Sequence, residues 1–106
     1  MEEVRKNFDA KDVFNTSNAH SLNDLEDGTE ISVIGVYITE KPDKDGVVKP
    51  VCYFKTSDKI YGTISNSVIS SAVAIPELLV DGEPLAIRVV KRKSANNRKY
   101  NLIELV

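Results

Sequence analysis

The chain has 106 residues, of which 42% are hydrophobic and 28% are charged, and its formal net charge is −2. These values are typical of one soluble globular domain, and no apolar run approaches the roughly 18 residues that a membrane-spanning helix needs. Cys52 is the only cysteine, which excludes an intramolecular disulfide and fits a reducing compartment.

The charges are distributed unevenly along the chain. Residues 1–30 contain three Lys or Arg against eight Asp or Glu, whereas residues 84–106 contain six Lys or Arg against one Glu. Partners respond to the local field rather than to the total charge, so the basic end could meet a polyanion. The alternative is that these charges form an ordinary solvated face.

The first part of the chain is polar, and its charged start, MEEVRKNFDAKD, is not expected to be a secretory signal peptide. We predict a flexible N-terminal segment over residues 1–11 and one folded domain over residues 12–106. Within that domain, an extended piece is expected around Asp12–Asn15. A single helical turn is expected over Ser21–Gly28, closed by a tight Asp27-Gly28 turn.

Three strands are predicted in the middle of the chain. The first runs from about Glu30 to Thr39, and Gly35 inside it marks a bulge or a sharp bend. The second and third strands are VCYFKT and KIYGTI, and the loop before the second contains an Asp45-Gly46 turn. The core-facing side chains of the first strand are then Ile31, Val33, Val36 and Ile38.

One short helix follows, in KIYGTISNSVISSAVAIPELL, with Ser65 or Ser67 as its N-cap and its end near Ala74, before Pro76. The hairpin EPLAIRVVKRK–SANNR–KYNLIELV completes the chain. Five strands with one helix between the third and fourth are the arrangement of the OB-fold, a small barrel that binds ligands on its second and third strands and two loops. The predicted fold is therefore all-β with one short helix, a five-stranded OB-fold barrel.

The residues that could perform catalysis are few. One histidine and one cysteine cannot form a nitrogen and sulfur metal cage within one chain. The sequence also contains no glycine-rich phosphate loop and no nucleophile with a partner base. We therefore expect a protein that is not an enzyme and that has no cofactor.

Aromatic and basic residues on one predicted face indicate a nucleic-acid-binding site. Single strands are bound by rings that stack on bases, in a groove whose Lys and Arg contact the phosphates. Strand alternation places three tyrosines on the outer side of neighbouring strands, although a strand tyrosine can equally pack and a hairpin lysine can protect a sheet edge. The predicted nucleic-acid-binding residues are Tyr37, Tyr53, Lys55, Tyr61, Arg88, Arg92, Lys93 and Arg98. The face of Tyr100 depends on the register of the last strand.

Three stretches, FNTSNAHSLNDLEDGTEI, KIYGTISNSVISSAVAIPELL and LAIRVVKRKSANNRKYNLIEL, resemble the single-stranded DNA-binding proteins of small tailed phages that replicate by protein priming. The resemblance covers about residues 13–106, although this chain is shorter and its end is basic. It implies an OB-fold that coats displaced strands during DNA replication, cooperatively and without sequence preference, in the host cytoplasm. It also assigns base stacking to Tyr61 and Tyr37.

The expected partner is single-stranded DNA, with replication proteins as further candidates and no membrane. The predicted function is compatible with two oligomeric states, a monomer or weak self-association along DNA. The alternative function is that of a non-enzymatic protein-binding β-barrel, a phage accessory factor whose acidic N-terminal third meets a basic partner.

Overall fold

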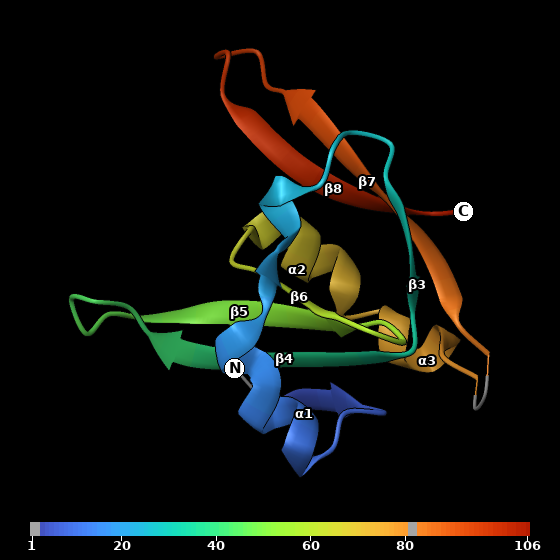
Figure 1. The fold of residues 1–106 in the computed structure, drawn as a ribbon. Coiled ribbons are helices and arrows are strands. Elements are labelled where there is room, and N and C mark those ends of the chain that lie inside the picture. Colours follow the sequence, from blue (N-terminus) through green and yellow to red (C-terminus); the bar gives the residue numbers. More distant parts are fainter. Residues whose placement is uncertain (1–2, 81–82) are drawn as a thin grey trace.

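The computed structural model describes residues 3–80 and 83–106, which form two β-sheets with short helices around them (Figure 1). In chain order the elements are β1 (Val4–Lys6), α1 (Ala10–Asn15), the 3-10 turn η1 (Thr16–Asn18), β2 (His20–Ser21), the 3-10 turn η2 (Leu22–Asp24), β3 (Glu30–Val33), β4 (Gly35–Pro42), β5 (Val48–Lys55), β6 (Ile60–Thr63), α2 (Asn66–Ala72), α3 (Ile75–Leu78), β7 (Leu85–Lys93) and β8 (Lys99–Leu105).

The strands form a five-stranded sheet of order β1-β4-β5-β6-β2 and a three-stranded sheet of order β3-β7-β8. The chain is mostly β with a few short helices, which agrees in part with the prediction of an all-β fold with one short helix. Helix α2 lies between the third and fourth predicted strands, but α1 and α3 were not predicted. The predicted closed five-stranded barrel is wrong. Closure would need β6 to pair with the last strand, but β6 pairs instead with β2, through His20↔Tyr61 and Ser21↔Gly62.

The long first strand of the prediction turns a corner and contributes to both sheets. It divides at Ile34, so that β3 pairs with β7 and β4 pairs with β5. A Cβ at Gly35 would lie 2.4 Å from the backbone oxygen of Asn7, so only glycine fits there without a shift. The Ile34 N–H donates to the Lys55 carbonyl at 2.8 Å. The bend predicted at Gly35 is thus confirmed.

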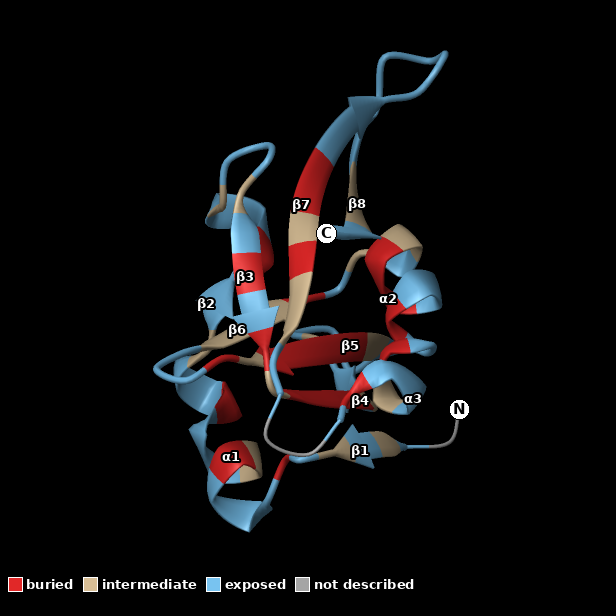
Figure 2. Ribbon diagram, turned by 90° about the vertical axis from the view of Figure 1, so that its right-hand side faces the viewer, coloured by how far each residue is buried: buried red, intermediate tan, exposed pale blue. Residues whose placement is uncertain are grey.

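The main core lies between the two sheets and is closed by α2 (Figure 2). Its members from the corner strand are those predicted from the alternation: Ile31, Val33, Val36 and Ile38, all buried. Helix α2 begins where Ser65 accepts a hydrogen bond from the Val68 N–H at 3.4 Å, and its apolar stripe of Val68, Ile69 and Ala72 faces this core.

The N-terminal segment packs over the outer face of the five-stranded sheet. Residues 3–11 form β1, which pairs with β4, and the beginning of α1, although a flexible start was predicted over residues 1–11. Residues 1 and 2 lie outside the described residues. A capping box between Asp9 and Asp12 makes α1 helical in place of the expected extended piece. The Asp12 N–H holds the pKa of the Asp9 carboxyl below its usual value.

Cys52 gives a direct test of this core. Its side chain is fully buried, and burial raises the pKa of its thiol to about 12. Because the thiolate is the reactive form, iodoacetamide at pH 8 should modify the folded protein only as fast as it opens, and the urea-unfolded protein rapidly. Mass spectrometry at timed intervals measures both rates. Equal rates would contradict the placement of β5 in the core.

Candidate nucleic-acid interface

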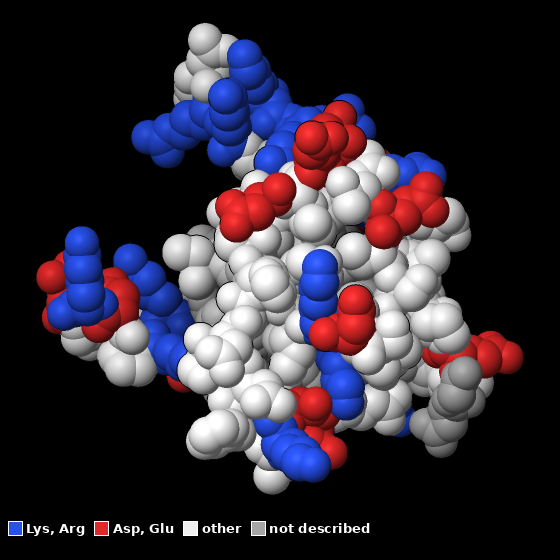
Figure 3. Space-filling view, in the orientation of Figure 1, with Lys and Arg blue, Asp and Glu red and all other residues white. Residues whose placement is uncertain are grey.

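The hairpin formed by β7 and β8 extends away from the body of the protein (Figure 1). In its connecting turn the Ser94 N–H donates to the Arg98 carbonyl at 2.9 Å, and Asn97 adopts a left-handed φ of 64°. Residues 91–100 are exposed and include five Lys or Arg but no Asp or Glu. The hairpin therefore presents a concentrated positive charge to solvent, at the upper left of Figure 3.

The pairing register separates this charge onto two faces. Lys93 pairs with Lys99 and Lys91 pairs with Asn101, so these four side chains share one face, here called the lysine face. Lys91 Nζ donates to the Asn23 carbonyl at 2.8 Å, and the Asn101 amide donates to the Asn23 side chain. These bonds show that the lysine face is turned toward η2.

The opposite face of the hairpin is largely neutralised. Arg88 lies 3.6 Å from Glu30 and 3.8 Å from Glu104, and Arg92 lies 3.6 Å from Glu104. Arg88 and Arg92 were predicted to contact phosphates. In this structure a phosphate would have to displace the carboxylates that already pair with them. Lys93 and Lys99, by contrast, form no ion pair with the described residues, and neither does Arg98 in the turn.

An open cleft of about 450 Å³ lies beside the lysine face. Its lining residues are Asn23, Lys91, Arg92, Lys93, Lys99, Tyr100 and Asn101. The β4–β5 hairpin forms a second arm, with a hollow between the arms in Figure 3. That arm is less basic because Lys49 pairs with Asp43 at 3.1 Å, and this contact holds the pKa of the Asp43 carboxyl below its usual value. Of the two arms, the β7–β8 hairpin therefore carries more positive charge without an ion-pair partner among the described residues.

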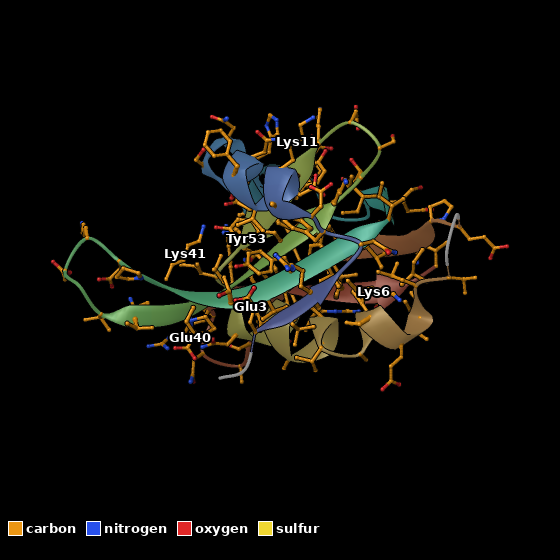
Figure 4. All side chains as sticks on the ribbon, turned by 90° about the horizontal axis from the view of Figure 1, so that it is seen from below. Glu3, Lys6, Lys11, Glu40, Lys41 and Tyr53 are labelled. Atoms are coloured by element: carbon orange, nitrogen blue, oxygen red, sulfur yellow. The ribbon has the colours of Figure 1, made fainter. Side chains whose placement is uncertain are left out.

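Tyr37 and Tyr53 share the outer face of the sheet, as predicted, but that face is covered. Each is only 7% exposed, and the Tyr37 ring stacks between Phe8 at 5.2 Å and Tyr53 at 6.1 Å. Tyr53 also accepts a hydrogen bond from Lys41 at 2.9 Å; both residues lie between the N-terminal segment and the sheet (Figure 4). The predicted base platforms at Tyr37 and Tyr53 are thus occupied by protein in this structure.

Lys55 and Tyr61 also differ from the prediction. Lys55 is on the outer face but forms an ion pair with Asp12 at 2.7 Å. Tyr61 pairs with Phe54 and packs against the main core, on the face opposite to Tyr53. The residue across from Tyr53 is Gly62, where a Cβ would lie 3.0 Å from the Tyr53 ring. The third strand was therefore predicted one residue out of register.

Two exposed aromatic side chains were not among the predicted site residues. Tyr100, at 37% exposure, lines the cleft, and Phe14 on α1 is 79% exposed. The register of β8 decides the role of Tyr100 and of the lysine face, and no local pattern specifies it. The exposure of Phe14 could have been predicted from the Asp9–Asp12 capping box. The box indicates a helix, and in that helix Val13 packs against the sheet while Phe14 is exposed.

The described residues contain no group of three or more His, Cys, Asp or Glu that could bind a metal ion. No helix among them is long and apolar enough to cross a membrane. Comparisons of the chain with models of known protein families, with curated proteins and with solved structures found no match.

Proposed function

We propose that the protein binds single-stranded DNA without sequence preference and coats it during phage DNA replication. The observation that supports this most strongly is the lysine face, an unneutralised row of cations beside an open cleft with an exposed tyrosine. Single-strand binders combine these two components, a basic groove for the phosphates and a ring for the bases. The replication context comes from the resemblance of the sequence to phage proteins.

In this proposal Lys91, Lys93 and Lys99 contact the phosphates. A base stacks on Tyr100, which pairs with Arg92 on the other face of the hairpin and borders the same cleft. Arg98 in the turn extends the basic path. Tyr37 and Tyr53 act through packing because the protein itself covers their rings, and the half-buried Tyr61 packs against the main core. Sequence independence follows, since every base has a face that can stack and every nucleotide has a phosphate.

The test replaces Lys93 and Lys99 together by glutamine. These two side chains form no ion pair with the described part of the chain, so the substitution should leave the fold intact. Each phosphate contact on a single strand contributes about −0.7 to the slope of log affinity against log salt, so two lost contacts should reduce the slope by about 1.4. If the affinities of the two proteins are equal at 1 M salt, the same relation predicts about 25-fold weaker binding at 0.1 M salt.

Fluorescence anisotropy of labelled oligo(dT) across a salt series measures both quantities. The control is Arg5→Gln with Lys6→Gln, which removes the same charge from β1, at the far edge of the five-stranded sheet. It should leave the slope unchanged. If the two double variants had the same slope of log affinity against log salt, the lysines of the lysine face would not contact phosphates. Parallel titrations with duplex DNA and RNA measure the preference for single-stranded DNA.

A protein-binding role is the second candidate. An apolar groove of about 100 Å³ between α3 and β8 is lined by Leu78, Ile87, Ile103 and Leu105, and part of it is exposed. A protein that works through this groove would bind oligo(dT) negligibly at every salt concentration. The salt series therefore separates the two functions.

A further inference from the structure

A second exposed aromatic side chain, Phe14, lies on α1, next in the chain to Asn15, which lines a polar pocket. The preceding residue, Val13, packs against the cluster of Phe8, Tyr37, Val51 and Tyr53, and Phe14, about 100° further round the helix, is exposed to solvent. The Phe14 side chain is 79% exposed, the highest value among the exposed large hydrophobic side chains of the described residues. A ring exposed to this extent is available to stack on a ligand.

The pocket has a volume of about 310 Å³ and lies between the α1–η1 segment and the turn that joins β5 to β6. The turn is held by hydrogen bonds from the Thr56 N–H to the Lys59 carbonyl at 2.8 Å and from the Lys59 N–H to the Thr56 hydroxyl at 3.1 Å. The Asp12–Lys55 ion pair lies in its wall. These contacts hold the turn and one wall of the pocket in place.

Four lining side chains have unused binding capacity. Those of Asn15, Asn18, His20 and Lys59 form no hydrogen bond or ion pair with the described residues. Asparagine amides and an imidazole match the donors and acceptors on the edge of a nucleobase, and a lysine matches a phosphate. Together with the exposed ring of Phe14, one residue before Asn15, these groups provide each kind of contact that a nucleotide in a single strand can make.

We infer that Phe14 and this pocket form a second contact site for the single strand, in which Phe14 stacks on a base and Lys59 meets a phosphate. The inference rests on the proposed function. Residues 15–23 connect the pocket, through Asn15, Asn18 and His20, with the cleft of the lysine face, through Asn23. Asn23 is five positions after Asn18, so at most about 18 Å of chain joins them. A few nucleotides could therefore reach both the pocket and the cleft.

The chain contains no tryptophan, so Phe14→Trp creates a single fluorescent reporter at an exposed position. Titration with oligo(dT) should quench its emission in parallel with the anisotropy signal. The control is Val73→Trp at the C-cap of α2, which is 53% exposed and lies on the side of the molecule away from α1 (Figure 2). Its emission should not change. Equal quenching in both variants, or none in Phe14→Trp, would overturn the inference.

The affinity measurement uses Phe14→Ala, which should bind oligo(dT) on the order of tenfold more weakly, as expected for one stacking platform. Its salt slope should equal that of the wild type, because stacking releases few ions. If Phe14→Ala binds oligo(dT) normally and the double variant Lys93→Gln/Lys99→Gln binds it more weakly, the second site is rejected and the proposed function still holds. Wild-type protein that binds no oligo(dT) at low salt would reject both. Slow Cys52 labelling in each variant confirms that it is folded.

Discussion

Replacing Tyr53 by alanine should lower the free energy of unfolding by about 3–5 kcal/mol, the usual cost of truncating a large buried aromatic side chain. The Tyr53 ring is 7% exposed, stacks on Tyr37 and lies against Gly62. Its hydroxyl accepts a hydrogen bond from Lys41, which would lose this partner. Urea denaturation followed by circular dichroism measures the change.

The matched control is Tyr53→Phe, which keeps the ring and removes only the hydroxyl. It should cost about 1 kcal/mol, the typical net value of one hydrogen bond. The alternative interpretation, in which Tyr53 is a base platform, predicts a different pattern: normal stability for Tyr53→Ala and weakened oligo(dT) binding. That pattern would contradict the burial of this ring beneath the N-terminal segment.

Substituting Gly35 by alanine is the second change with a large expected effect. The new methyl group would lie 2.4 Å from the Asn7 oxygen and 3.1 Å from the Asn7 carbonyl carbon, both backbone atoms that cannot rotate away. We expect a loss of about 3 kcal/mol, at the upper end of the range for overpacking. The strain should separate β1 from β4, so the β1 amides that are hydrogen-bonded to β4 should lose their protection from hydrogen exchange.

Gly46→Ala is the control for the loss of a glycine. A Cβ at Gly46 would meet nothing within 4 Å, but its φ of +79° is left-handed, which costs a non-glycine residue roughly 1–2 kcal/mol. This variant should keep the exchange protection of β1. If Gly35→Ala retained it as well, the corner would not be as closely packed against Asn7 as the structure indicates.

The main core could be predicted from sequence because the strand residues that face it are apolar and alternate with residues that do not face it. Ile31, Val33, Val36 and Ile38 follow that rule on either side of a glycine, and Ser65 gave the start of α2. Closure of a barrel could not be predicted correctly, because the edge of β6 is taken by β2, a strand of only two residues. A strand this short has no periodicity that a sequence pattern could reveal.

The candidate site was harder to predict because it depends on which strand residues lie opposite each other. A slip of one residue moves every side chain of a strand to the other face, and this is what happened with Tyr61. The same pairing separates Lys93 and Lys99 from Arg92, which meets Glu104. The sequence correctly identified a basic hairpin, but not which of its cations are uncompensated.

The corner at Ile34 and Gly35 has a thermodynamic consequence for any ligand held between the two hairpins. One continuous segment, Glu30–Pro42, belongs to both sheets, and its bend is fixed by the hydrogen bond to Lys55 and by the contact with Asn7. The sheets therefore cannot rotate freely about each other, and the arms that extend from them keep a set relative orientation. A binding surface that is preorganised in this way loses little conformational entropy on association, so more of its contact energy is available as affinity.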